Sequence, residues 1–115
     1  SGELTLEGVT WLLDKTLPDT EITAEFSDSR VKGSAGCNDY NGPYRSTRAA
    51  GKNTIEIGPL ATTMMMCDEA VMEQEQLYLG ALDSATEYTI EGFALTITYP
   101  GGTLLFYDKD GARPR

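Results

Sequence analysis

The stretch TEYTIEGFALTITY, residues 86–99, decides the fold class of this chain. In its first half Tyr88 and Ile90 alternate with polar residues, and its second half repeats the alternation. Successive side chains of a strand point to opposite faces of a sheet, so a period of two predicts two half-buried strands. Gly92 between them permits a tight turn. The stretch therefore predicts an antiparallel hairpin.

The same alternation recurs along most of the chain. Further strands are expected at residues 21–26, 30–35, 54–57 and 104–106, with turns at Asp28-Ser29 and Pro100-Gly101-Gly102. Short strands joined by tight turns favour pairing between neighbours in sequence. The pattern predicts a curved, mainly antiparallel sheet of about seven to eight short strands.

One segment, near residues 68–82, has a helical period instead. One face of this helix gathers six residues: Val71, Met72, Glu75, Tyr78, Leu79 and Leu82. Asp68 precedes it, and its carboxylate is expected to accept a hydrogen bond from an early backbone N–H. The predicted fold class is therefore α+β, with one helix covering an edge or face of the curved sheet.

Length and composition are those of one folded domain. The chain has 115 residues, of which 40% are hydrophobic, and this suffices for a single core. We expect the domain to cover residues 1–108 and a polar tail to cover 109–115. No run of about 18 apolar residues is present, so no transmembrane segment is expected. The first residue is Ser1 rather than methionine, which indicates a processed chain or a piece of a longer one.

The charge balance argues against nucleic-acid partners. Eighteen acidic and nine basic residues give a formal net charge of −9, which repels a phosphate backbone. The acids are spread along the chain, as is typical of a solvated surface. We expect a monomer without nucleic-acid partners.

The chain lacks most of the residue types and motifs that common catalytic sites use. The chain has no histidine, so it lacks the commonest general base and metal ligand. No phosphate-binding glycine loop is present. A carboxylate pair acting as a hydrolase is the remaining catalytic alternative, but the strand acids lie mostly at outward positions. We expect no enzyme activity, no cofactor and no metal.

The residues from Gly36 to Tyr44 are the segment richest in turn-forming and anchoring residue types. Glycines at 36 and 42 permit unusual backbone geometry, Asn38 can bond to nearby backbone, and Tyr40 and Tyr44 can anchor the segment. The segment is either a ligand-binding loop or a rigid connection. Turn chemistry alone explains each residue type, which favours the rigid connection.

Three consecutive methionines, Met64 to Met66, precede Cys67. Thioether and thiolate ligands suit Cu(I), but consecutive residues cannot all point at one ion. The flexible methionine side chain also fills irregular space, which is the simpler interpretation where a strand leads into a helix.

These segments together resemble a known family. The similarity is carried by Trp11-Leu12-Leu13, Phe26, Gly36-Cys37-Asn38 with Tyr40, Gly42 and Tyr44, residues 57–64, Met66-Cys67, Glu75, Tyr78-Leu79, Leu82, Leu95-Thr96-Ile97 and Leu105-Phe106. In this order they resemble the META domain, also called the HslJ-like heat-shock lipoprotein family. Pro43 and the triple methionine are slight departures.

The resemblance implies a compartment and the outline of a role. It implies a bacterial envelope or periplasmic protein, often a lipoprotein or a module of a larger exported chain, without catalytic residues. It also implies links to heat shock, antibiotic tolerance, and motility or secretion. The expected function is a structural or protein-binding envelope domain, with an unknown envelope protein as partner and a stress-related role.

The alternative is a binding module for a small apolar ligand or lipid chain, as in pilot lipoproteins of secretion systems. A sheet curled around an open interior would support that alternative, whereas a core filled by aromatic side chains would oppose it. The side chains expected to fill it are those of Trp11, Phe26, Tyr88, Phe93 and Phe106.

Three further expectations concern single residues. The oxidising compartment that the resemblance implies, two cysteines and no histidine for zinc together predict a disulfide between Cys37 and Cys67, with two buried free thiols as the alternative. Trp11 is expected in the core, because apolar residues flank it. Glu75 lies within the apolar helix face, so it is either a structural acceptor for backbone N–H groups between Gly36 and Gly42 or an acid in a functional pocket.

Overall fold

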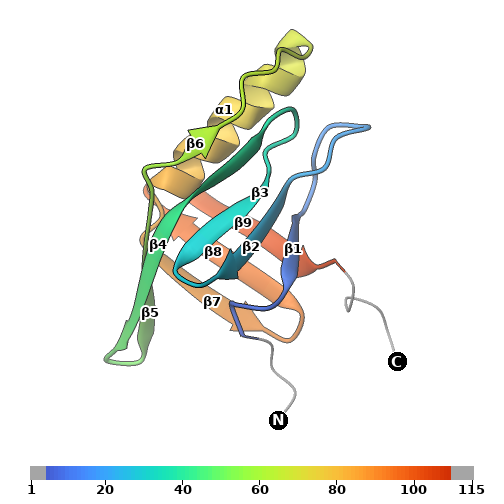
Figure 1. Ribbon diagram of the computed structural model, residues 1–115. Helices are drawn as coiled ribbons and strands as arrows, with labels where there is room; N and C mark the ends of the chain where they lie inside the picture. Colours follow the sequence, from blue (N-terminus) through green and yellow to red (C-terminus); the bar gives the residue numbers. More distant parts are fainter. Residues whose placement is uncertain (1–4, 110–115) are drawn as a thin grey trace.

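The computed structural model describes residues 5–109, which form nine strands and one helix (Figure 1). The strands are β1 (Thr10–Leu13), β2 (Thr23–Ser27), β3 (Arg30–Ser34), β4 (Asp39–Ala49), β5 (Lys52–Ile57), β6 (Ala61–Thr62), β7 (Glu87–Glu91), β8 (Ala94–Tyr99) and β9 (Gly102–Asp108). The helix is α1 (Glu69–Asp83). The tail expected at 109–115 falls outside the described residues except for Lys109, whose backbone N–H donates to the Thr10 carbonyl.

The strands close into a barrel. Strand neighbours follow the order β3-β2-β1-β9-β8-β7-β5-β4-β6, and a further pairing of β3 with β4 completes the ring. All of these pairings are antiparallel, so the predicted α+β class with a curved antiparallel sheet is confirmed. Nine strands form where seven to eight are expected from the sequence, and the two residues of β6 are too few to show a period. The longest strand, β4, begins at Asp39, so most of the Gly36–Tyr44 segment is a strand rather than the expected loop or rigid connection. Its Asn, Gly and Pro residues are typical of turns and conceal the alternation.

The hairpin predicted from residues 86–99 forms as strands β7 and β8. Tyr88 faces Ile97 and Ile90 faces Leu95 across the pair, so their side chains share one face of the sheet. The β2–β3 hairpin turns at Asp28 and Ser29, which both have positive φ, +51° and +65°. Two positive φ values match the twist of a tight hairpin, and they explain this two-residue connection.

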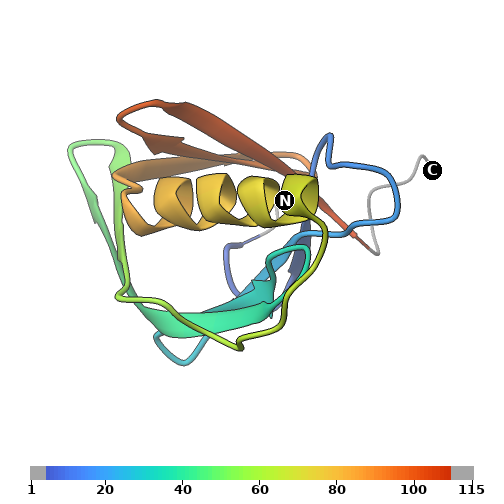
Figure 2. The same ribbon diagram turned by 90° about the horizontal axis from the view of Figure 1, so that it is seen from above.

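Helix α1 lies across one end of the barrel (Figures 1 and 2). Its buried residues are Glu75, Tyr78, Ala81 and Leu82, which face the barrel interior. Asp68 occupies the N-cap position, but its side chain makes no capping hydrogen bond, so this part of the sequence prediction is wrong. Its backbone carbonyl instead accepts the Met72 N–H, which is the first intrahelical bond.

The barrel interior is filled by side chains. Its core includes Trp11, Ile22, Phe26, Val31, Tyr40, Ile55, Leu82, Leu95, Ile97 and Phe106. Trp11 is 0% exposed, and its indole N–H donates to the Leu6 carbonyl at 3.0 Å. Two aromatic residues differ from expectation. Tyr88 is only partly buried, and Phe93 is 37% exposed because it lies in the turn after Gly92 rather than inside a strand.

Candidate functional site

The carboxylate of Glu75 lies between helix α1 and the loop that leads from β3 to β4. One oxygen, Oε1, accepts the backbone N–H groups of Cys37 at 3.1 Å and Asn38 at 2.7 Å. The other, Oε2, accepts the side-chain amide of Asn38 at 2.8 Å. Glu75 is 2% exposed, and both of its oxygens are occupied. The contacts are those of a buried structural acceptor.

Asn38 uses its whole side-chain amide to join two loops. Besides the bond to Glu75, Nδ2 donates to the Met65 carbonyl at 3.1 Å. Oδ1 accepts the Thr63 hydroxyl at 2.9 Å and the Met65 N–H at 2.6 Å. Two donors and two acceptors are the full capacity of the group. Asn38 thereby ties the β3–β4 loop to the segment between β6 and α1, and it is 3% exposed.

A disulfide joins the same two segments. Cys37 and Cys67 are bonded with a Cα–Cα distance of 6.1 Å, which is within the ordinary range for a disulfide. Within residues 5–109 no cysteine is free. Since Cys37 precedes Asn38 and Cys67 precedes α1, the disulfide and the polar bonds hold the same two segments together. We call this set of contacts the joint; it is made by Cys37, Asn38, Thr63, Met65, Cys67 and Glu75.

Two glycines of the segment have geometry that excludes a side chain. Gly36 has φ +109°, a conformation that residues with a Cβ rarely adopt. Gly42 lies so close to the segment after β5 that an added Cβ would lie 2.7 Å from the Pro59 carbonyl oxygen. The strained turn and the close packing explain these two glycines without a ligand.

Tyr40 belongs to the buried polar network beneath the joint. Its hydroxyl donates to the Thr23 carbonyl at 2.7 Å, so the Tyr78 hydroxyl, 2.7 Å away, must be the donor in the contact between the two phenols. Burial raises the pKa of both Tyr40 and Tyr78 above the ordinary value. Both hydroxyls therefore stay neutral near pH 7 and anchor α1 to β4 and β2.

Tyr44 and Trp11 lie away from the joint. The Tyr44 ring packs edge-on against Phe26 with a centroid distance of 4.9 Å, and its hydroxyl donates to the Glu7 carboxylate. Burial and then the hydrogen bond to Glu7 raise the pKa of Tyr44. The structure thus brings Cys37, Asn38, Cys67 and Glu75 together, and it places Trp11 and Tyr44 in the packing of the barrel.

The three methionines after β6 are displayed on the surface. Met64 is 90% exposed, Met65 57% and Met66 85%. The interpretation that these side chains fill irregular interior space is therefore wrong, because Asn38 and the disulfide hold the backbone while the side chains point outward. Over residues 5–109, no three His, Cys, Asp or Glu side chains cluster in a way that could hold a metal ion.

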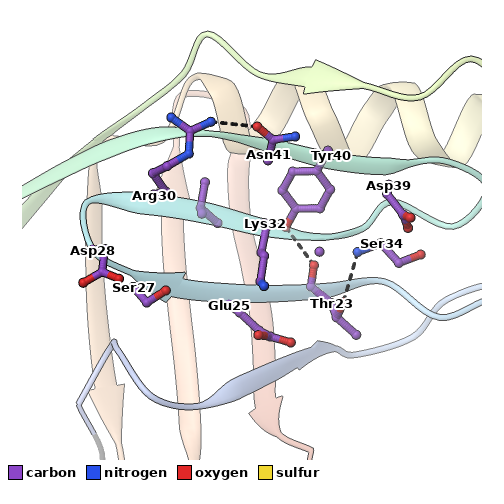
Figure 3. Close-up of a pocket in the computed structure, with 12 residues that line it drawn as sticks. Thr23, Glu25, Ser27, Asp28, Arg30, Lys32, Ser34, Asp39, Tyr40 and Asn41 are labelled. Carbon is purple, nitrogen blue, oxygen red and sulfur yellow. Dashed lines mark hydrogen bonds between the residues drawn. The ribbon is translucent and has the colours of Figure 1, made fainter.

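Several surface hollows lie outside this joint, and two of them are considered as binding surfaces. One, of about 690 Å³, lies on the outer side of β2, β3 and β4 and carries Glu25, Arg30, Lys32 and Asp39 (Figure 3). Lys32 is paired in register with Glu25, so a cation lies beside this carboxylate. The hollow is lined by side chains of both charge signs. Among the site residues predicted from the sequence, only Tyr40 lines it.

The other hollow is a groove of about 410 Å³ beside α1. It is lined mainly by apolar side chains, among them Leu13, Leu17, Leu77, Tyr78 and Leu104. Leu77 is 76% exposed, on the outer side of the helix. The groove lies outside the filled barrel interior.

Three contributors to these contacts were missed by sequence reasoning. Thr63 bonds to both Asn38 and the backbone of Asp39, and Met65 takes part through its backbone alone. Gln74 accepts the Leu17 N–H at 2.8 Å and so holds the β1–β2 connection against α1. A backbone contact leaves no signal in the residue type, whereas the family resemblance over residues 57–64 did mark the segment that contains Thr63.

The comparisons with known proteins bear on the family and on the fold. The sequence profile of the META domain matches residues 4–111. The chain belongs to the META domain family. No curated protein matches this META domain. This chain is similar to an NMR structure of a protein from Burkholderia xenovorans. The two are 24% identical with a TM-score of 0.66, and the match covers 92% of this chain and 84% of that one. A second NMR structure of a protein matches at 21% identity with a TM-score of 0.68, covering 94% and 95% of the two chains. At these identities the likeness shows the fold alone.

The family also bears on the compartment. META domains are usually extracytoplasmic, and a disulfide is consistent with an oxidising compartment. The single helix in the described part of the chain is too short and too polar to cross a membrane.

Proposed function

We propose that this META domain is a non-catalytic, protein-binding module of the bacterial cell envelope, and that Met64, Met65 and Met66 form its docking loop. The observation that carries the proposal is the exposure of three large apolar side chains, 90%, 57% and 85%, on one short segment. Flexible, polarizable methionine side chains suit surfaces that bind partner proteins.

The joint below the loop supports this role. Asn38 bonds to the Met65 N–H and carbonyl, and the disulfide holds Cys67 directly after the methionines. A loop held in this way loses little conformational freedom when a partner binds, which lowers the entropic cost of association. Glu75 serves the same purpose, because all its bonds go to the joint.

A site-specific crosslink tests the proposal. A photo-reactive amino acid at position 64 should crosslink to one partner protein in an envelope extract of the source organism. Replacing Met64, Met65 and Met66 together by glutamine, with the crosslinker moved to the neighbouring exposed position 62, should abolish that crosslink. Glutamine has similar length and leaves the backbone bonds of Met65 in place.

The matched control is Leu77→Gln, which removes an equally exposed apolar side chain from α1. It should leave the crosslink unchanged. The proposal fails if position 64 gives no discrete crosslinked band, or if Leu77→Gln removes the band as completely as the methionine changes do.

The second candidate function is the binding of a small apolar ligand or a lipid chain. The filled barrel interior opposes an internal pocket, whereas the groove beside Leu17 and Leu77 favours a surface site. Titration with a short-chain lysophospholipid below its micelle concentration should then shift the NMR signals of both leucines. Leu77→Gln should weaken binding, and shifts spread over the whole domain would contradict a defined site.

A further inference from the structure

The backbone of strand β4 has one open edge. The Pro43 carbonyl accepts the Gly58 N–H, so the backbone groups of Pro43 point toward β5. Backbone groups of successive residues in an antiparallel strand alternate between its two edges. The N–H and C=O groups of Ser46 and Arg48 therefore point to the edge opposite β5. The Tyr44 N–H follows the same rule, since it donates to the Ser29 carbonyl on that side.

Strand β3 ends before it can cover this edge. Its pairing with β4 begins at Arg30 opposite Pro43, and the chain then turns at Asp28 and Ser29. Beyond Tyr44, no strand within residues 5–109 pairs with the Ser46 and Arg48 edge. Figure 1 shows the β4–β5 hairpin projecting from the end of the barrel opposite α1. Unpaired donors and acceptors in a row are a template for another strand.

The sequence around this edge is basic, unlike the domain as a whole, and one of its cations, Lys52, pairs with Glu87 of β7 at 3.6 Å. Residues 30–57 contain five of the nine basic residues and only two of the eighteen acidic ones. Arg45 pairs with Glu56 at 2.6 Å. Arg48 bonds only to the neutral side chain of Asn53 at 3.1 Å, and no carboxylate within residues 5–109 forms an ion pair with it.

We propose that the Ser46–Arg48 edge of β4 binds an extended acidic segment of another protein by strand addition. The segment would exchange backbone hydrogen bonds with Ser46 and Arg48, and one of its carboxylates would pair with the Arg48 guanidinium. A second copy of this chain is disfavoured, because two basic edges would meet and each copy carries a net charge of −9. This surface is distinct from the methionine loop, which lies at the end of the barrel covered by α1 (Figure 1).

Amide exchange measured by NMR tests the open edge. In the free domain the amides of Ser46 and Arg48 should exchange quickly, whereas those of Arg45 and Thr47, which bond to β5, should be protected. The probe is a capped peptide of sequence TEITAEF, residues 20–26, which is acidic and contains most of strand β2. At saturating peptide, exchange at Ser46 and Arg48 should slow by about fivefold or more, the factor that one net hydrogen bond of about 1 kcal/mol gives.

Reversing the charge of Arg48 and of the peptide tests whether the edge prefers an acidic segment. Arg48→Glu should weaken binding of TEITAEF by about fivefold and should create binding of the basic counterpart TKITAKF, which the unchanged domain does not bind. Arg30→Glu is the matched control, because it makes the same charge change on β3, at a residue that pairs with Pro43 and not with Ser46 or Arg48. It should alter both affinities by less than about twofold.

Ser46→Pro tests the backbone contribution. It removes an outward N–H without removing a bond to β5, so the β4–β5 ladder should survive while peptide protection is lost. The proposal is overturned if the Ser46 and Arg48 amides are already protected in the free domain. It is also overturned if TKITAKF binds as well as TEITAEF, if peptide shifts map to another face, or if Arg30→Glu weakens binding as much as Arg48→Glu.

Discussion

The two halves of strand β4 differ in how they are held. The first half, from Asp39 to Pro43, has β3 on one edge and β6 on the other, and it buries Tyr40 and Gly42. The second half, from Tyr44 to Ala49, pairs with β5 alone, and all but its first residue is exposed. One continuous strand therefore runs from a tightly bonded joint into a projecting hairpin.

The first half of β4 is thus held by more than strand pairing. At the first half, the polar bonds of Asn38 and Glu75 and the disulfide add to the backbone ladder. In the second half beyond Tyr44, the contacts are the ladder to β5, the exposed ion pair of Arg45 with Glu56, and the bond from Arg48 to the Asn53 side chain. We therefore expect substitutions near the joint to change the free energy of unfolding, and substitutions on the hairpin to leave it almost unchanged.

The largest expected effect comes from the core beneath both halves. Trp11→Ala should lower the free energy of unfolding by about 3–5 kcal/mol, because it leaves a large cavity and removes the indole bond to Leu6. Chemical denaturation with fluorescence of the tyrosines measures this loss. Amide protection should fall in both halves of β4 together. A loss below about 1 kcal/mol would mean that the barrel interior relaxes around the cavity.

The next effect concerns the joint alone. Replacing Cys37 and Cys67 by serine opens a crosslink between residues 30 positions apart, which in the chain-entropy model costs about 3–4 kcal/mol. Urea denaturation of the double variant measures the cost. Under native conditions amide protection should fall first around Asn38 and Met65, while the Arg45 and Thr47 amides change only with global stability. An unchanged midpoint would show that the polar bonds suffice.

A smaller effect separates the polar bonds from the disulfide. Glu75→Leu should destabilise by about 1–3 kcal/mol, because it leaves the Cys37 and Asn38 N–H groups without an acceptor. Glu75→Gln should cost less, since its carbonyl oxygen still accepts both N–H groups and only the bond from the Asn38 amide is lost. Thermal denaturation should rank the variants in this order. Equal losses would contradict a role for Glu75 as acceptor.

The smallest effect is expected on the hairpin. Arg45 and Glu56 form an ion pair, but their side chains are 79% and 73% exposed. Arg45→Ala should therefore change the free energy of unfolding by less than about 0.5 kcal/mol. Urea denaturation at low and high salt measures the change. A loss above 1 kcal/mol would erase the contrast between the two halves of β4.

The sequence predicted the elements better than their contacts. The period of two in residues 86–99 and the helical stripe near 68–82 both correspond to observed elements. Strand β6 and the exposed position of Phe93 were not anticipated, since two residues show no period and a turn residue can face either way. The start of β4 was expected to be a loop or a rigid connection, because its Asn, Gly and Pro residues are typical of turns. The Asp68 cap was predicted from its position, but the hydrogen bond depends on a side-chain geometry that position alone does not set.

By itself, the sequence determined the fold class, the family and the need for Glu75 to find hydrogen-bond donors. Each of these follows from local periodicity, from motif spacing or from the cost of burying one charge. Only the tertiary structure decided that β1 pairs with β9 and β5 with β7, that Asn38 joins Glu75 to Met65, and that the Ser46 and Arg48 edge stays open. These features depend on which distant segments meet and where a neighbouring strand ends, and such contacts leave no periodic signal along the chain.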